Sequence, residues 1–347
     1  MIREGIQKLI EGIDLTPEES GAIMTEVMSG KASNSQTSAF LTALRMKGEA
    51  VEELIAFASV MKRHCHQIHP KVQGRLVDTC GTGGDKVKTF NISTAAAFVI
   101  AGAGVAVAKH GNRAVTSKSG SADVLEKLGL NLALEPQTIE SIIERVGIGF
   151  MFAPAFHPAM KYAAEARREI GIRTVFNILG PLTNPASANA QLLGVYDKKL
   201  VAPIAYTLQK LGCEEAMVVH GLDGLDEVST VGGTVIAHLK DNNVTKAELS
   251  PEDFGVKKAE IRDLQCLSAE ESAETLFRIL NGKVMGPKTD FVIVNAAAGI
   301  IIGGKASDFK EGTELARKSI ESGVAYRKLV DLVKASGGNL EKLEELE

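Results

Sequence analysis

The stretch VDTCGTGGDKVKTFNIST, residues 77–94, combines residue types that hold phosphate groups in proteins. It matches neither familiar nucleotide-binding pattern, because no Gly-Lys-Ser/Thr closes it and Lys86 stands where a dinucleotide fingerprint needs its third glycine. Its glycines let backbone N–H groups approach an anion closely, and Ser93 and Thr94 add hydroxyls at the start of an expected helix. The alternative is an ordinary turn between a strand and a helix with a Ser/Thr cap.

Positive charge is concentrated around this stretch. Residues 86–122 contain no aspartate or glutamate, and their Lys and Arg residues are Lys86, Lys88, Lys109, Arg113 and Lys118. A second polar stretch, KHGNRAVTSKSGS at 109–121, again follows an expected strand and precedes an expected helix. Two such neighbouring loops can surround a ligand with several phosphates. A solvated basic face is the alternative.

A ligand with several phosphates usually brings Mg²⁺, which prefers oxygen ligands. The segment GLDGLDEVST offers the adjacent acids Asp226 and Glu227 after an expected strand at 217–220, with Asp223 close by. In a loop, both side chains of the pair can turn toward one site. Simple surface charge is the commoner role of such a pair.

Three arginines follow in the segment AEARREIGIRTVFNILGPLTNP, residues 164–185. They are Arg167, Arg168 and Arg173, and an arginine side chain is suited to bidentate recognition of a carboxylate. The residues themselves do not distinguish the three arginines, and ion pairs with the neighbouring glutamates are the alternative.

A third cluster, RHCHQIHP, holds His64, Cys65, His66 and His69 within six residues. We interpret it as a linker, because no partner pair elsewhere has a zinc-like spacing. The chain also has no G-x-S-x-G motif and no cysteine placed as a nucleophile.

The elements that must position these side chains follow from the hydrophobic pattern. The first 65 residues predict helices alone, with Thr16-Pro17-Glu18-Glu19 as a helix start. Short β-prone runs at 76–78, 105–107, 150–152, 192–196 and 217–220 then alternate with helical stretches at 92–101, 121–128, 138–146 and 200–211. A β-hairpin is expected at 228–249 around Asp241-Asn242-Asn243.

We therefore expect an α/β protein with two domains. A small all-helical N-terminal domain at 1–70 would be completed by helices near 160–190, and a large α/β catalytic domain at 71–347 would contain a mostly parallel central sheet flanked by helices.

The 347-residue chain carries a net charge of −4, which argues against general nucleic-acid binding. Its longest apolar run, residues 95–108, is too short to span a bilayer, and its N-terminus lacks the apolar segment of a signal peptide. Four widely separated cysteines are typical of reduced thiols. We expect a cytoplasmic protein that binds neither nucleic acid nor membrane.

Seven segments occur in the order DTCGTGGD, NIST, KHGNR, SGSADVLEKLG, HPAMK, RTVFNILGPLTNP and DEVST. Together they resemble the anthranilate phosphoribosyltransferase family of tryptophan biosynthesis, over essentially the whole chain. Pyrimidine nucleoside phosphorylases share the architecture and a glycine loop, but KHGNR and RTVFNILGPLTNP resemble the transferase.

The resemblance implies the nucleoside phosphorylase/phosphoribosyltransferase type of fold and a homodimer formed through the helical domain. It implies transfer of the phosphoribosyl group from phosphoribosyl pyrophosphate to the amine of anthranilate, with release of pyrophosphate. The donor would be held by Gly81, Gly84, Asp85, Thr89, Asn91, Ile92, Ser93, Thr94, Lys109, His110, Gly111, Asn112, Arg113, Ala114, Val115, Thr116, Ser117 and Ser121. Anthranilate would contact Gly81, Asn112 and Arg167, and Mg²⁺ would be held by Ser93, Asp226 and Glu227.

This chemistry fits the residues without a catalytic dyad. Negative charge builds on the leaving pyrophosphate, where Mg²⁺ and backbone N–H groups stabilise it. The amine of anthranilate is neutral near pH 7 and needs positioning more than a strong base. Two other hypotheses are a pyrimidine nucleoside phosphorylase-like enzyme and a non-enzymatic relative that binds nucleic acid. The role of Asp85 and the number of magnesium ions stay open.

Overall fold

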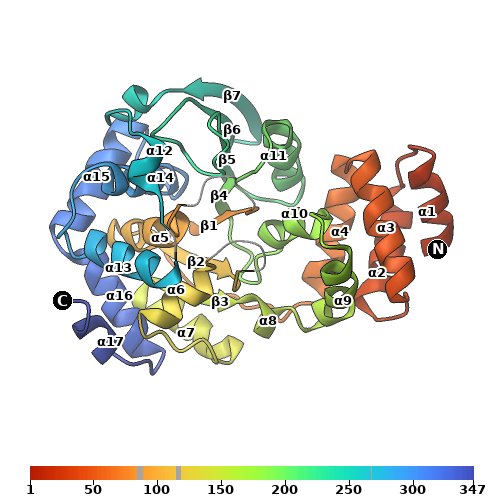
Figure 1. Ribbon diagram of the computed structural model, residues 1–347, viewed down its shortest axis with the longest axis horizontal. Helices are drawn as coiled ribbons and strands as arrows, with labels where there is room; N and C mark the ends of the chain where they lie inside the picture. The colour runs from red at the N-terminus through yellow and green to blue at the C-terminus, as the bar shows by residue number, and fades with distance from the viewer. Residues whose placement is uncertain (84–88, 115–118, 267) are drawn as a thin grey trace.

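The computed structural model describes residues 1–83, 89–114, 119–266 and 268–347. Four helices form a bundle at one end of the molecule (Figure 1). They are α1 (Ile2–Ile10), α2 (Pro17–Met28), α3 (Asn34–Lys47) and α4 (Val51–Arg63). This bundle confirms the small all-helical N-terminal domain that the sequence predicts.

Local hydrogen bonds set where these helices begin. The Thr16 hydroxyl accepts the Glu19 N–H at 3.2 Å, and the Glu19 carboxylate accepts the Thr16 N–H at 3.0 Å. This capping box is the one that the Thr-Pro-Glu-Glu segment predicts for α2. Ser33 and Gln36 form the same reciprocal pair at the start of α3.

A buried carboxylate ties the bundle together. Glu53 of α4 is 0% exposed, and it accepts the N–H groups of Leu15 at 2.9 Å and Ala50 at 2.8 Å. The Lys47 ammonium donates to the same carboxylate at 3.0 Å. The interhelix segments at Leu15 and Ala50 are therefore held by one side chain.

Glu53→Ala is expected to lower the free energy of unfolding by about 3–5 kcal/mol, because it leaves two backbone donors without their acceptor and takes from the buried Lys47 ammonium one of its two carboxylate partners, the other being Asp14. Glu52→Ala, at the exposed neighbouring position, is the matched control and should cost less than about 1 kcal/mol. Urea unfolding followed by circular dichroism measures both. Equal losses in the two variants would contradict this role of Glu53.

A seven-stranded sheet forms the centre of the rest of the molecule. Its strands are β1 (Leu76–Gly81), β2 (Ala106–Gly111), β3 (Ile148–Phe152), β4 (Ala190–Gly194), β5 (Glu215–Gly221), β6 (Thr234–Lys240) and β7 (Asn243–Leu249). The order is β3-β2-β1-β4-β5-β6-β7, parallel from β3 to β5 and antiparallel for β6 and β7. The mostly parallel sheet expected from the sequence is confirmed.

The predicted hairpin is β6 and β7. Its turn residues Asp241 and Asn242 have φ of 50° and 56°, and such left-handed pairs favour Asp and Asn. The hairpin extends the parallel sheet at its β5 edge (Figure 1).

Helices cover both faces of the sheet. They are α5 (Ile92–Gly102), α6 (Ser121–Lys127), α7 (Pro136–Val146), α8 (Ala153–Phe156), α9 (Lys161–Ile170), α10 (Val175–Leu182), α11 (Val201–Lys210), α12 (Ile261–Leu264), α13 (Ala269–Leu280), α14 (Pro287–Ile302), α15 (Phe309–Glu321), α16 (Val324–Ala335) and α17 (Glu341–Glu344). Three 3-10 turns accompany them, η1 (Pro158–Met160), η2 (Lys198–Leu200) and η3 (Pro251–Phe254). Consecutive strand residues point to opposite faces, so Val219 joins the core with α5 and α14, whereas Val218 joins the core with α11 and the bundle.

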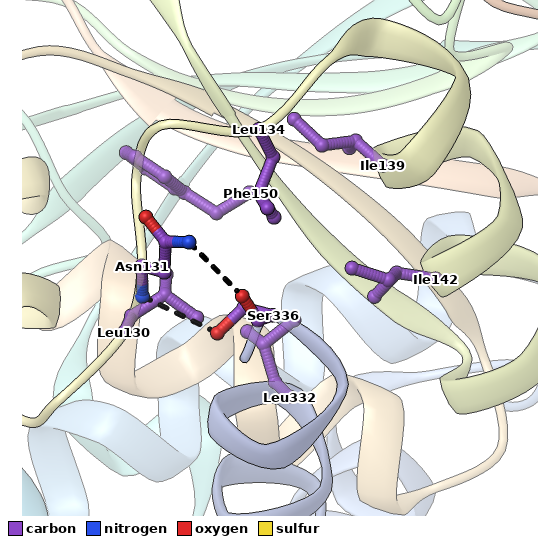
Figure 2. A pocket seen from close by; sticks show the side chains of 8 residues that line it. All are labelled: Leu130, Asn131, Leu134, Ile139, Ile142, Phe150, Leu332 and Ser336. Atoms are coloured by element: carbon purple, nitrogen blue, oxygen red, sulfur yellow. Dashed lines mark hydrogen bonds between the residues drawn. The ribbon is translucent and has the colours of Figure 1, made fainter. Parts of the chain in front are cut away.

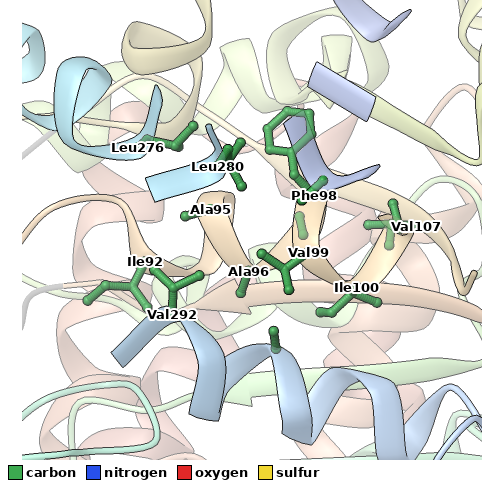
Figure 3. Close-up of a cluster of buried hydrophobic side chains, with 14 of the residues drawn as sticks. Ile92, Ala95, Ala96, Phe98, Val99, Ile100, Val107, Leu276, Leu280 and Val292 are labelled. Atoms are coloured by element: carbon green, nitrogen blue, oxygen red, sulfur yellow. The ribbon is translucent and has the colours of Figure 1, made fainter. Parts of the chain in front are cut away.

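Helix α5 is buried on all sides. Every residue from Thr94 to Ala101 is buried, and α5 packs against β1, β2, α13, α14 and α16. Figure 3 shows Phe98, Val99 and Ile100 of α5 among side chains of the surrounding elements. The first turn of α5 therefore has a rigid support.

The helices α9 and α10 lie beside the bundle in Figure 1. Helix α9 packs against α2 and α3, and α10 packs against α3 and α4. We propose that they complete the helical domain, and the boundary near residue 70 stays a prediction.

A small cavity lies between β3, α7 and α16 (Figure 2). Its volume is about 10 Å³, and Asn131 beside it donates from its side chain to the Ser336 carbonyl at 3.2 Å. That volume holds at most one water molecule, so this cavity is not a substrate site.

Candidate active site

The carboxyl ends of β1 and β4 meet where the strand order reverses, which is where open α/β sheets bind ligands. Gly81 and Gly194 are paired there, and the segment containing Asp226 lies against both. A Cβ atom on Gly81 would lie 2.4 Å from a carboxylate oxygen of Asp226, and one on Gly194 would lie 1.5 Å from its carbonyl oxygen. Both glycines are therefore needed for the approach of the acidic segment.

Asp226 joins this segment to the glycine-rich loop. Its carboxylate is buried and accepts the Gly83 N–H at 2.8 Å. Burial raises the pKa of Asp226, and the Gly83 N–H and the positive charge of Arg173 oppose this rise. A cation bound here would favour the ionised carboxylate.

Two residues that the sequence interpretation did not single out hold the acidic segment. Asn295 of α14 is fully buried, accepts the Val228 N–H at 2.9 Å and donates to the Val228 carbonyl at 3.0 Å. The Ser229 hydroxyl donates to Asp223 and accepts two further N–H groups. The sequence signal that could have identified Asn295 is its position as a single polar side chain in the apolar run FVIVNAAAGIII.

Lys109 lies within β2, not in the loop after it. The strand continues to Gly111 because Lys109, His110 and Gly111 pair with β3. The alternation along β2 buries the Lys109 side chain, whose ammonium donates to the Thr79 carbonyl at 2.5 Å and to the Ser93 hydroxyl at 3.3 Å. Burial lowers the pKa of Lys109, and the negative charges of Asp78 and Glu227 oppose this change.

The first turn of α5 is held against β1. The Thr79 hydroxyl donates to the Ser93 carbonyl at 2.9 Å, and Thr89 forms an isolated bridge with Gln265. Within this turn Ile92 and Thr94 are buried, whereas Asn91 and Ser93 stay partly accessible. The hydroxyl and amide groups at the helix start are therefore the ones available to a ligand.

The second loop carries less free positive charge than its sequence suggests. Arg113 pairs with Glu126 at 2.8 Å and Asp123 at 3.1 Å, and these acids lie just beyond the acid-free stretch. Asp123 also accepts the N–H groups of Ala114 and Gly120, each at 2.9 Å. Because Lys109 is buried and Arg113 is paired, the accessible positive charge here is smaller than the number of Lys and Arg residues in the sequence suggests.

The predicted site residues Gly84, Asp85, Val115, Thr116 and Ser117 lie outside the described residues, as do Lys86, Lys88 and Lys118. The other predicted donor residues lie on or next to β1, α5, β2 and the start of α6, where the Ser121 hydroxyl donates to the Asn112 carbonyl at 3.4 Å. The predicted metal ligands Asp226 and Glu227 follow β5, and Arg167 lies on α9.

The donor atoms near Asp226 fit Mg²⁺. No group of three or more His, Cys, Asp or Glu side chains able to hold a metal occurs among the described residues. Mg²⁺ does not require one, since it is usually bound by one or two carboxylates, waters and substrate phosphates. The Ser93 hydroxyl lies 3.3 Å from the Lys109 ammonium, and the negative charge of Glu227 acts on the same ammonium by opposing the fall of its pKa.

The His64 and Cys65 side chains, in the segment expected to be a linker, contact backbone carbonyls of α4. The His64 ring nitrogen faces the Val60 carbonyl at 3.0 Å, and the Cys65 thiol donates to the Lys62 carbonyl. The His66 N–H donates to the Phe156 carbonyl, so backbone contacts account for the segment.

The three arginines differ in their surroundings. Arg167 of α9 is partly buried, and its guanidinium lies over the Phe176 ring of α10 at 5.2 Å. Arg173 lies over Tyr196 at 4.6 Å, whereas Arg168 is exposed. Burial lowers the pKa of Arg167, and no salt bridge involves it within the described part of the chain. Arg167 is thus a partly buried arginine whose charged form is disfavoured by burial, although the lack of a salt bridge is shared by Arg168 and Arg173 within the described ranges.

Two buried histidines lie next to α10. The rings of His110 and His157 are 5.0 Å apart, and His110 Nε2 and both ring nitrogens of His157 lack a hydrogen-bond partner among the described residues. Burial lowers the pKa of His110 to about 3 and that of His157 to about 4. Both imidazoles are therefore neutral near pH 7.

These low pKa values make the fold sensitive to acid. Below pH 6.5 His110 and His157 are protonated in the unfolded chain but stay neutral in the folded chain. The free energy of unfolding therefore decreases as the pH falls toward 4. Between pH 7.5 and 5.5 each histidine should cost about 1.4 kcal/mol of unfolding free energy. His157→Gln should remove about that much of the loss, which urea unfolding at the two pH values measures. An unchanged loss in the variant would show that His157 is protonated in the folded protein.

No helix within the described ranges is long and apolar enough to cross a membrane.

The fold and site define a glycosyl transferase built from two parts. Residues 3–65 match the family described as "Glycosyl transferase family, helical bundle domain", and residues 73–326 match "Glycosyl transferase family, a/b domain". An anthranilate phosphoribosyltransferase of Petrotoga mobilis is 51% identical over 328 residues, which is 94% of this chain and 95% of that protein. The chain belongs to the anthranilate phosphoribosyltransferase family.

Solved structures agree with this membership. The anthranilate phosphoribosyltransferase of Thermus thermophilus has a TM-score of 0.91 and 41% identity, covering 96% of this chain and 99% of that one. The enzyme of Saccharomyces cerevisiae in complex with PRPP and Mg has a TM-score of 0.89 and 30% identity, covering 97% and 98%.

Proposed function

We propose that this chain transfers the phosphoribosyl group of phosphoribosyl pyrophosphate to the amine of anthranilate, giving N-(5-phosphoribosyl)anthranilate and pyrophosphate in tryptophan biosynthesis. The observation that carries the proposal is the contact of Asp226 with the glycine-rich loop at the β1/β4 switch point. It brings a carboxylate suited to Mg²⁺ beside backbone suited to phosphate. The family membership supports the same reaction.

On the donor side, the first turn of α5 and the end of β2 supply the groups. The partly accessible Asn91 and Ser93 and the N–H groups of α5 would bind phosphate oxygens. Lys109, whose ammonium already lies beside Ser93, would add positive charge where the leaving pyrophosphate becomes more negative. Gly84, Asp85 and residues 115–117 remain sequence-based candidates for this site.

Asp226, Glu227 and the Ser93 hydroxyl would hold Mg²⁺, as oxygen ligands of the type that this ion prefers. When bound, Mg²⁺ neutralises charge on the pyrophosphate and so makes it a better leaving group. The yeast relative, described in complex with PRPP and Mg, supports this cofactor.

On the acceptor side, Arg167 would bind the carboxylate of anthranilate, and Asn112 and Gly81 would border the ring. The uncompensated charge of Arg167 and its position over Phe176 support this role. The neutral His110 and His157 would present polar edges without adding charge near the amine. Positioning of a neutral amine nucleophile is the main task of this side.

The reaction is tested by anthranilate fluorescence. Pure protein with Mg²⁺ and phosphoribosyl pyrophosphate should abolish it, and omission of either should preserve it. Phosphorolysis of a pyrimidine nucleoside without consumption of anthranilate would support the phosphorylase instead.

We also infer a cytoplasmic homodimer that contacts no nucleic acid. The four free cysteines support a reducing compartment. Exposed Ile10, Ile13 and Met46 on or near the helical bundle support its burial against a second copy. Sedimentation at micromolar concentration should give twice the chain mass.

A further inference from the structure

The side chain of Asn91 is turned away from the helix that it precedes. Asn91 is the N-cap residue of α5, a position where asparagine usually accepts an N–H group of the first turn. Here its side chain makes no capping hydrogen bond. Its Oδ1 instead accepts the hydroxyls of Ser119 at 2.7 Å and Ser272 at 2.8 Å.

The Ser272 hydroxyl acts as both donor and acceptor toward Asn91. The Ser272 hydroxyl donates to the Asn91 side chain, and it accepts the Asn91 backbone N–H at 3.0 Å. Ser272 is 0% exposed, so both hydrogen bonds form away from bulk water. The position of the Asn91 amide is therefore set by a residue 181 positions away in the sequence.

Ser272 stands on a helix that supports both phosphate-binding loops. Helix α13 packs against α5, which follows the first loop, and against α6, which follows the second. Asn91 also donates to the Ser119 carbonyl at 3.4 Å and thereby links the first loop to the second. The contacts of Ser272, Asn91 and Ser119 thus connect α13 to both loops at once.

We propose that Ser272 is a positioning residue for the sugar-phosphate donor. The N–H groups of Ile92 and Thr94 already donate to the carbonyls of Phe90 and Asn91. By holding the Asn91 side chain against Ser119, Ser272 leaves the remaining first-turn N–H group, that of Ser93, to a phosphate oxygen of the ligand. Without the Ser272 hydroxyl, the Asn91 side chain keeps only its contacts with Ser119, so it is held less firmly and can turn toward the first turn of α5, where it would compete with the donor. This inference rests on the proposed function, because it assigns the donor to the start of α5.

Ser272→Ala should raise the KM for phosphoribosyl pyrophosphate about tenfold, and kcat and the KM for anthranilate should stay within about twofold. Ser272→Thr keeps the hydroxyl and should restore the donor KM to within about threefold of the wild type. Calorimetry of phosphoribosyl pyrophosphate with Mg²⁺, without anthranilate, should show the same tenfold loss for Ser272→Ala.

Ser319→Ala is the matched control. Ser319 is also a buried helix serine that bonds to α5, but it donates to the Val99 carbonyl at 2.9 Å, far along the helix from Asn91. It should lower the melting temperature as Ser272→Ala does, with an unchanged donor KM. An unchanged donor KM in Ser272→Ala, or equal increases in the two alanine variants, would overturn the proposal. If the wild type binds the donor but does not consume anthranilate, the proposed function is refuted. The calorimetric comparison of donor binding would then still decide whether Ser272 positions the donor.

Discussion

Asp226→Asn combined with Glu227→Gln is expected to lower kcat/KM for the donor by about 10²–10³-fold, the range found when one electrostatic stabiliser of a transition state is removed. The exchange keeps an oxygen that can accept the Gly83 N–H, so the contact between the acidic segment and the glycine-rich loop can persist. It removes the two negative charges that would hold Mg²⁺. The loss should therefore shrink as the Mg²⁺ concentration is raised.

Steady-state rates measured over a magnesium series test this expectation. The matched control is Glu252→Gln with Asp253→Asn, an adjacent acidic pair in η3 that should leave the magnesium dependence unchanged. If the Asp226/Glu227 variant altered only the KM for anthranilate, the assignment of these carboxylates to the metal would be wrong.

Arg167→Ala is expected to raise the KM for anthranilate about 10–100-fold and the KM for the donor less than about threefold. A charge-assisted hydrogen bond to a carboxylate is worth about 1.5–3 kcal/mol, which corresponds to this range. The guanidinium over Phe176 is already partly desolvated before a ligand binds. Most of the hydrogen-bond energy is therefore available to a carboxylate ligand. Arg167→Lys should give a KM for anthranilate between those of the wild type and Arg167→Ala, because lysine keeps the charge but loses the bidentate geometry.

Arg168→Ala is the control, since Arg168 is the exposed neighbour on the same helix. It should leave both KM values within about twofold. A larger effect on the donor KM than on the anthranilate KM in Arg167→Ala would move Arg167 from the acceptor to the donor side.

Several elements followed from the sequence because residues close together along the chain determine them. The capping box at Thr16 and Glu19 and the Asp241-Asn242 turn are hydrogen-bond and backbone preferences of adjacent residues. The apolar α5 and the alternation of strands and helices predicted the parallel sheet. Strand ends were less predictable, as the extension of β2 through Lys109 depends on its pairing with β3.

The tertiary structure decided which charges remain available. Arg113 is paired with Asp123 and Glu126, and Lys109 is buried against Thr79, so neither matches the free cation that a count of residues suggests. Such partners come from neighbouring elements, whose packing the local pattern does not specify.

The sequence by itself determined the residue types of the site, namely its glycines, hydroxyls and adjacent acids, and through them the family. The tertiary structure alone decided that Asp226 would reach Gly83, 143 residues away, and that Ser272 would hold Asn91. The physical reason is that residue type fixes which hydrogen bonds and charges are possible, whereas the strand order and the packing of α13 and α14 decide which of these groups meet.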